Sequence, residues 1–281
     1  MQRLTRITAV VVVGAVVYVA TGVAAPRQSP QNDLIAYDVQ PDNKDFIDLY
    51  TVRPDGVGTR RLSRTPGESE TSPSWSPDHS LLAYATTLRK AVWVMRPDGS
   101  GKRRLATGGG NVAEFTPDGR VAFVSGASVV AVDIATRRQS LLRDLPFSPE
   151  SLAFSRDGRT LYAAGSGMPL YRVDLTSRAR PQRIRTPLPT ALEVDVSPTG
   201  DAIAYLTAGR SFESRRVYVA RPDGSGARRL PGDAGAYGVA FSPDGSHVAI
   251  VRADDRIAVV PMAGGDVRLI EARSVSGEID W

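Results

Sequence analysis

Short hydrophobic runs alternate with polar turns along most of the chain. Residues 81–84 (Leu-Leu-Ala-Tyr) and 92–95 (Val-Trp-Val-Met) are two such runs, and turns rich in Pro, Asp and Gly separate them. Runs of about four residues with aromatic and β-branched side chains, bounded by turn residues, are typical of strands. The pattern predicts an all-β chain built from many short strands.

A longer phrase recurs with a regular period. It consists of an apolar anchor residue, a turn resembling Ser-Pro-Asp-Gly and a second apolar run. Its five anchors are spaced by 40, 39, 42 and 45 residues: Trp75, Phe115, Phe154, Val196 and Phe241. A second phrase begins Arg-Pro-Asp-Gly and ends Arg-Arg-Leu, at residues 53–62, 96–105 and 221–230. A period of about 40 residues with room for four strands indicates the blades of a β-propeller.

The two ends of the chain predict how the ring closes. Residues 276–281 (Ser-Gly-Glu-Ile-Asp-Trp) repeat the first phrase as far as its anchor, and Trp281 lies 40 residues after Phe241. Residues 34–37 (Leu-Ile-Ala-Tyr) match a second strand with no first strand before it. We therefore predict a six-bladed β-propeller over residues 33–281, in which the C-terminal strand completes the first blade. Such closure removes an exposed sheet edge.

Residues 1–26 have a different pattern. Arg3 and Arg6 precede an uncharged apolar run of 19 residues, 7–25, which as a helix at ~1.5 Å per residue would cross a ~30 Å hydrocarbon core. Two interpretations remain open, an uncleaved signal anchor and a signal peptide cleaved among the small residues 22–25. Residues 27–32 form a polar linker. Both interpretations predict an extracytoplasmic propeller, either tethered to the cell membrane by a single N-terminal helix or secreted.

Composition excludes several classes of site. The chain has no cysteine, which excludes disulfides, thiolate zinc sites and cysteine nucleophiles, and it has two histidines. The formal charge is +5, but 32 of the 35 basic residues are arginine, a bias that says little about partners. An extracytoplasmic location disfavours nucleic acid.

The paired phrases resemble the WD40-like (PD40) repeats of the TolB family. The resemblance covers about residues 32–281 and rests on five anchored phrases and a partial sixth. TolB carries an α/β domain before its propeller, and here the apolar segment occupies that place. The resemblance implies a six-bladed propeller that binds proteins or peptides at one mouth of the ring.

Strand alternation places both turn phrases of each blade at one end of the ring. The more variable loops then lie at the opposite end, where a repeat protein typically encodes binding. We place a candidate binding site at the channel mouth on that side. Acidic residues near the inner strands and two aromatic residues are its candidates: Glu70, Glu150, Glu193, Glu278, Phe147 and Tyr237.

The acidic set leaves three alternatives open. Together with Glu114, Asp195 and Asp280, these carboxylates can be structural or solvated, can bind Ca²⁺, or can serve acid–base hydrolysis. Their offsets from the anchors are one, three, four and five residues, which argues against a single ring of ligands. Phe147 and Tyr237 can equally be packing residues of a blade.

These observations favour an extracytoplasmic, non-catalytic propeller of the cell envelope that binds a protein or peptide. We expect a monomer with no cofactor and assign no catalytic residue. The alternatives are a hydrolytic enzyme and a ligand sensor, each using carboxylates of the channel.

Overall fold

A computed structural model describes residues 33–41, 45–209, 211, 214–272 and 275–281. The predicted N-terminal helix within residues 1–26 and the linker 27–32 lie outside the described residues. Within the described ranges, no helix has the length and apolar character needed to cross a membrane.

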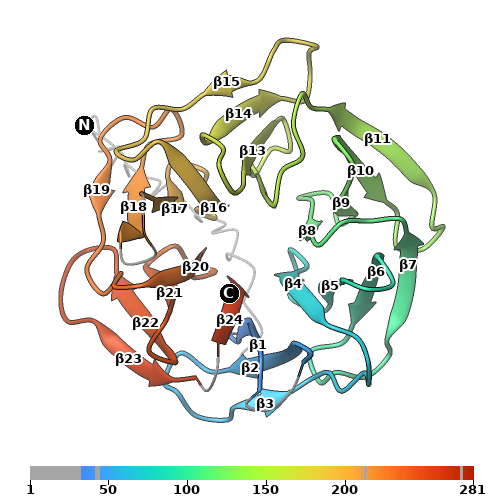
Figure 1. Cartoon of the computed structure of the whole chain (residues 1–281), viewed down its shortest axis with the longest axis horizontal. Coiled ribbons are helices and arrows are strands. Elements are labelled where there is room, and N and C mark those ends of the chain that lie inside the picture. The colour runs from blue at the N-terminus through green and yellow to red at the C-terminus, as the bar shows by residue number, and fades with distance from the viewer. Residues whose placement is uncertain (1–32, 42–44, 210, 212–213, 273–274) are drawn as a thin grey trace, which may run out of the picture. The chain divides into compact units, whose positions relative to one another are not determined.

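The described residues form six four-stranded antiparallel sheets arranged as blades around a central axis (Figure 1). The first blade comprises β24 (Val275–Asp280), β1 (Ile35–Val39), β2 (Asp48–Val52) and β3 (Arg60–Arg61). The second comprises β4 (Glu70–Trp75), β5 (Leu82–Thr86), β6 (Ala91–Met95) and β7 (Arg103–Thr107). The third comprises β8 (Ala113–Phe115), β9 (Val121–Ser125), β10 (Ser128–Val132) and β11 (Gln139–Asp144). The fourth blade comprises β12 (Ser151–Phe154), β13 (Thr160–Ala164), β14 (Tyr171–Asp174) and β15 (Gln182–Arg183). The fifth comprises β16 (Thr190–Val196), β17 (Ile203–Ala208), β18 (Arg216–Ala220) and β19 (Arg228–Arg229). The sixth comprises β20 (Ala236–Phe241), β21 (His247–Arg252), β22 (Arg256–Pro261) and β23 (Arg268–Glu271). The predicted six-bladed propeller is confirmed.

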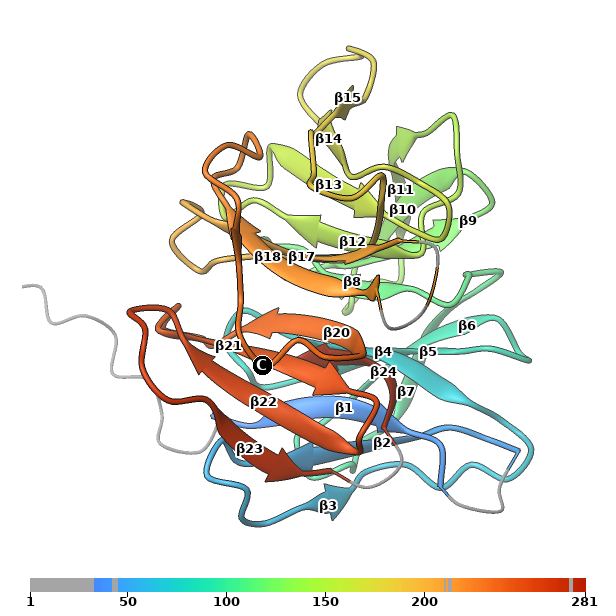
Figure 2. The same ribbon diagram turned by 60° about the vertical axis from the view of Figure 1, so that its left-hand side comes forward.

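The predicted closure of the ring is also confirmed. Strand β24 pairs antiparallel with β1, and Ile279 lies opposite Tyr37 (Figures 1 and 2). Trp281 follows β24 directly, is buried in the same apolar cluster as Tyr37, and donates from its indole nitrogen to the Asp33 carboxylate at 2.7 Å. The last strand of the chain therefore completes the sheet that the first described strands begin.

The anchors are the packing residues between blades. Trp75, Phe115, Phe154 and Phe241 are buried at the ends of their inner strands, and Val196 is half-buried. Each major apolar cluster combines residues of two adjacent blades, as where Phe115 of β8 packs with Ala83 of β5. The 40-residue spacing of the anchors thus places one apolar wedge at each junction between blades.

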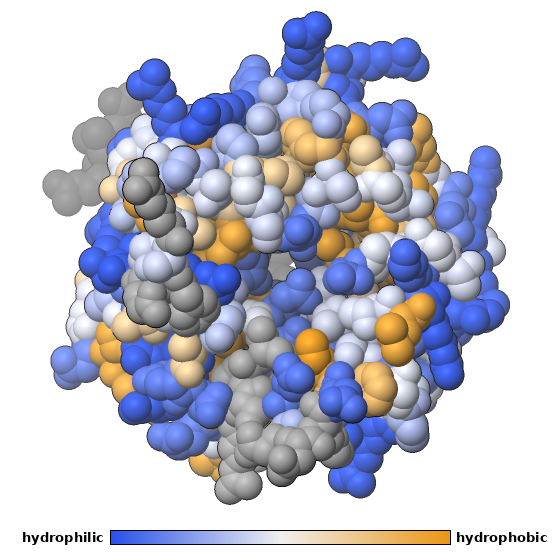
Figure 3. All heavy atoms as spheres, viewed as in Figure 1, coloured by the Kyte–Doolittle hydropathy of each residue, from blue (hydrophilic) through white to orange (hydrophobic). Residues whose placement is uncertain are grey.

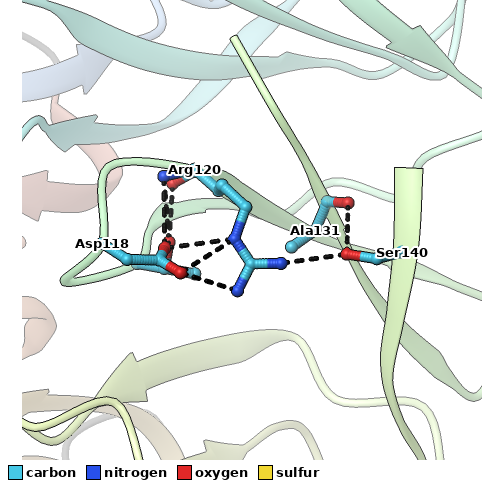
Figure 4. A network of polar contacts seen from close by, with 5 residues as sticks. Asp118, Arg120, Ala131 and Ser140 are labelled. Atoms are coloured by element: carbon cyan, nitrogen blue, oxygen red, sulfur yellow. Dashed lines mark hydrogen bonds and ion pairs between the residues drawn. The ribbon is translucent and has the colours of Figure 1, made fainter. Parts of the chain in front are cut away.

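The turn that follows the inner strand in the five blades other than the first is stabilised by its own residues. In the β8–β9 turn, the Thr116 hydroxyl donates to Asp118 at 2.5 Å, and Gly119 adopts the left-handed φ of 82° that glycine tolerates. Arg120 donates to the Asp118 carboxylate through Nε and reaches Ser140 on the outer strand β11 at 2.9 Å (Figure 4). The recurring turn aspartate is therefore explained by local hydrogen bonds, as the sequence indicates.

Candidate functional site

The centre of the ring holds a cavity of about 240 Å³ bordered by the inner strands. Figure 3 shows a hollow at the centre of the ring with hydrophilic residues around much of it. Its lining includes residues of β4, β8, β12, β16, β20 and β24, so each blade contributes. We call this space the channel.

Alternation along the inner strands places one row of polar side chains at the position before the anchor in four blades: Ser74, Glu114, Asp195 and Asp280. In this row the Asp280 carboxylate accepts a hydrogen bond from the Trp75 amide at 2.6 Å. The Asp195 carboxylate accepts a hydrogen bond from the Phe241 amide at 2.7 Å, and the Ser74 hydroxyl accepts one from the Phe115 amide at 3.0 Å. Each of these three acceptors thus satisfies the backbone of the next blade's inner strand.

A second row lies two residues earlier on the same strands. There Ser151 accepts from the Val194 amide at 3.2 Å, and Glu193 accepts from the Val239 amide at 3.1 Å. The mixed offsets of the acidic residues therefore resolve into two levels of one polar lining. Short serines and longer carboxylates occupy equivalent positions.

Glu278 belongs to the second row, but the residue next to it on the inner strand of the following blade is a proline. The equivalent position on the next blade is Pro73, which has no amide hydrogen to donate. The Glu278 carboxylate instead hydrogen-bonds the backbone of Ser72, while its Oε2 atom is buried and has no hydrogen-bond partner among the described residues. Its own amide donates to Asp38 on β1 at 3.0 Å.

Burial, together with mutual repulsion at most of these groups, raises the pKa values of the channel carboxyls. Desolvation, then repulsion from Asp195, raises the pKa of Asp280 to about 8 against the hydrogen bonds that oppose the shift. Desolvation also raises the pKa of Asp195 to about 6. The pKa values of Glu114, Glu193 and Glu278 are raised well above the ordinary range, first by desolvation and then by neighbouring carboxylates.

The mouth of the channel combines a cation, an aromatic ring and an exposed carboxylate. The guanidinium carbon of Arg215 lies 5.3 Å from the centre of the Tyr237 ring, a cation–π distance. Glu150 accepts hydrogen bonds from the Ser166 amide at 2.8 Å and from its hydroxyl at 2.7 Å. Arg215 is the basic residue of the lining among the residues that the structure describes there.

Four of the six candidate residues line the channel. They are Glu150, Glu193, Glu278 and Tyr237. Phe147 does not: its ring stacks on Tyr171 with 4.5 Å between ring centres and packs against the apolar cluster between the third and fourth blades. The packing alternative describes Phe147.

Glu70 also lies away from the channel, for a reason that offset counting misses. The register of β4 with β5 shifts between Thr71 and Ser74, and Ser72 has a positive φ of 55°. Such an irregularity reverses which face the earlier residues occupy. Glu70 is therefore buried away from the channel, and the hydroxyl of Ser63, on the connection from β3 of the first blade, donates to it at 3.2 Å.

Sequence reasoning missed the serines of the two rows, Asp38 and Arg215. The serines carry a usable signal, because Ser72, Ser74 and Ser151 share their offsets from the anchors with the acidic residues. The sequence gives no such signal for Asp38, because this residue lies on β1, the second strand of its blade, and is brought next to Glu278 only when the ring closes. The described residues contain no group of three or more His, Asp or Glu side chains able to hold a metal ion.

Comparisons with known proteins identify the fold. No family model matches the sequence. No curated protein matches it either. Among solved structures, TolB from Acinetobacter baumannii superposes with a TM-score of 0.72 at 18% identity, covering 89% of this chain and 66% of that chain.

Two further structures are similar. Kuenenia stuttgartiensis hydrazine synthase gives a TM-score of 0.55 at 18% identity, covering 76% of this chain and 70% of that one. A chain of a nidogen/laminin complex gives 0.52 at 12% identity, covering 88% and 82%. At these identities the likeness concerns the fold alone. The described chain is a TolB-like six-bladed β-propeller.

Proposed function

We propose that this chain is a non-catalytic propeller of the cell envelope that binds a protein or peptide at the channel mouth. The observation that carries the proposal is the central cavity of about 240 Å³, to which all six blades contribute and in which polar and apolar groups are combined. Concave sites with apolar walls and a few convergent polar groups are where proteins most often bind ligands.

The hydrogen bonds of the channel support binding over hydrolysis. Asp280, Asp195 and Glu193 each accept a backbone amide of the next blade. A carboxylate fixed in this way supports the ring, whereas general acid–base catalysis needs a carboxylate that can reach a substrate proton. One similar structure is a complex of nidogen with laminin, and a propeller that engages a protein is in keeping with the proposal.

A photo-crosslinking experiment tests the location of the site. A photoreactive phenylalanine analogue would replace Tyr237 at the channel mouth or, as the control, Asp223 in a turn of the fifth blade at the opposite end. We expect a discrete crosslinked product in intact cells from position 237 and none from position 223. Equal labelling at both positions, or no product from 237, would contradict the proposal.

The extracytoplasmic location is a separate part of the proposal. It rests on the apolar residues 7–25 preceded by Arg3 and Arg6. Fusion of a reporter enzyme active only outside the cytoplasm to the C-terminus should give activity, and mass spectrometry of the purified protein would show whether residues 1–26 remain. An inactive, stably produced fusion would contradict this part.

A further inference from the structure

One oxygen of Glu278, Oε2, is an unsatisfied acceptor, although the carboxylate receives a hydrogen bond from the Ser72 backbone. Glu193, in the same row, receives the Val239 amide. The neighbour of Glu278 is Pro73, which donates nothing, and the Oε2 atom of Glu278 is buried with no partner among the described residues. Leaving a charged acceptor unpaired in a buried place costs more than leaving a neutral one unpaired. The Oε2 atom therefore marks where a donor from outside the chain would gain most.

Carboxyl groups outnumber basic residues in the described lining of the channel. Six carboxyl groups line it, from Glu114, Glu150, Glu193, Asp195, Glu278 and Asp280. Repulsion connects them, because Glu278 affects both Glu193 and Glu114. The single basic residue of the described lining, Arg215, is held at the mouth against Tyr237 and donates to the Ala236 carbonyl at 3.4 Å. An occupant that carries positive charge would complement the interior.

The walls suit an elongated occupant with an apolar stem. Val112, Leu152 and Val239 line the same cavity as the carboxylates. Lysine and arginine combine an aliphatic stem with a terminal cation, and they bury the stem along apolar surface. The cavity of about 240 Å³ far exceeds the ~30 Å³ that one water occupies in the liquid. The described residues offer no group able to hold a metal ion.

We propose that the channel receives the cationic side chain of a lysine or arginine presented by a peptide or protein partner, with Glu278 as its principal acceptor and Glu193 beside it. This inference rests on the proposed function, since it names the chemistry of the ligand that the mouth takes. The bond formed is a charge-assisted hydrogen bond from the ammonium or guanidinium to the Glu278 carboxylate.

The test uses the full-length chain and a capped tripeptide, acetyl-Gly-Lys-Gly-amide, whose one charge is the lysine side chain. Binding is measured by ligand-observed NMR against the same peptide acetylated on its ε-nitrogen. We expect the charged peptide to bind at least tenfold more tightly than the acetylated one. Equal affinity of the two peptides would overturn the inference.

Variants place the cation in the channel. Glu278→Gln keeps the shape of the side chain and removes its charge. We expect this variant to bind the lysine peptide at least fivefold more weakly than the wild type does. Glu193→Gln provides a second variant, with a smaller expected loss. Glu271→Gln changes the net charge equally on the exposed outer strand β23 and should leave affinity unchanged. Wild-type affinity in a folded Glu278→Gln variant would overturn the inference.

Calcium chloride alone is the competing probe. Calcium binding that Glu278→Gln abolishes, with no binding of the lysine peptide, would overturn the inference in favour of a metal. Crosslinking from position 237 without peptide binding would leave the proposed function in place and reject this inference alone. Peptide binding without crosslinking from position 237 would leave this inference in place and reject the proposed function.

Discussion

The carboxylates of the turns and those of the channel behave in opposite ways. In the turns, the Ser76 hydroxyl donates to Asp78 at 2.6 Å, and hydrogen bonds of this kind lower the pKa values of Asp78 and Asp118. In the channel, desolvation and repulsion raise the pKa of Asp280 to about 8 although it too accepts backbone amides. The comparison shows that hydrogen bonds decide the pKa of a solvated carboxylate, whereas enclosure among like charges outweighs them.

The two sets also differ in how far along the chain their partners lie. Asp78 finds its donors two residues away, in Ser76 and Ser80. Asp280 accepts the amide of Trp75, 205 residues distant. A turn aspartate therefore stabilises one turn, and a channel carboxylate joins one blade to the next. The channel set should respond to any change that opens the ring, while the turn set should not.

Removing residues 275–281 should have the largest effect, because it deletes β24 and leaves β1 without its partner. We expect loss of cooperative unfolding in thermal melts followed by circular dichroism. Trp281→Ala alone should cost about 3–5 kcal/mol, because the ring is buried in the apolar cluster that also contains Tyr37. Leu269→Ala on the exposed part of β23 is the control and should change little. An unchanged melting curve for the truncated chain would refute closure of the ring.

Gly238→Ala should destabilise the junction between β20 and β24. A Cβ atom at position 238 would lie 2.2 Å from the Gly277 carbonyl oxygen, a backbone atom that moves only with its strand. Overpacking of this kind costs about 1–3 kcal/mol, measured by urea unfolding. Gly277→Ala, where a Cβ atom would meet nothing within 4 Å, is the matched control. Equal stabilities of the two variants would show that the strands approach less closely.

Glu278→Gln should stabilise the free protein at pH 8 and leave its stability unchanged near pH 4. The raised pKa means that the folded chain prefers protonated Glu278, so stability falls as pH rises above the ordinary value near ~4.3 and through the raised one. Glutamine removes that cost, a gain on the order of 1 kcal/mol in urea unfolding at pH 8. A variant less stable than wild type at pH 8 would contradict the raised pKa.

Asp118→Asn in the β8–β9 turn should have the smallest effect. The Arg120 guanidinium, which donates to this carboxylate, holds the pKa of Asp118 below its usual value, so its contribution exists above pH ~3.9 and disappears as pH falls. The pair is largely exposed and screened, so the expected loss at pH 7 is under about 1 kcal/mol and shrinks in high salt. A loss that persists at pH 2 would assign the effect to turn geometry instead.

The sequence predicts the ring well, because its signals are local and repeated. Spacing and turn chemistry predict the anchors from Trp75 to Phe241, the turns that follow them and the pairing of the last strand with the first. The structure confirms each of these. The channel was harder to predict, because it depends on neighbours in other blades. The irregularity at Ser72 turns Glu70 away from the channel, and Pro73 cannot donate an amide hydrogen to Glu278, whose Oε2 atom has no partner among the described residues. The predicted N-terminal helix stays a prediction.

Carboxyl-carbon NMR titration of the free protein, repeated with acetyl-Gly-Lys-Gly-amide, tests the contrast between turn and channel carboxyls most directly. We predict that Asp195 and Asp280 titrate with apparent pKa values of about 6 and 8, that Asp78 and Asp118 titrate below their ordinary range, and that the peptide lowers the apparent pKa of Glu278 without moving the turn aspartates. Channel and turn carboxyls that titrate together near pH 4, with no response to the peptide, would contradict the account.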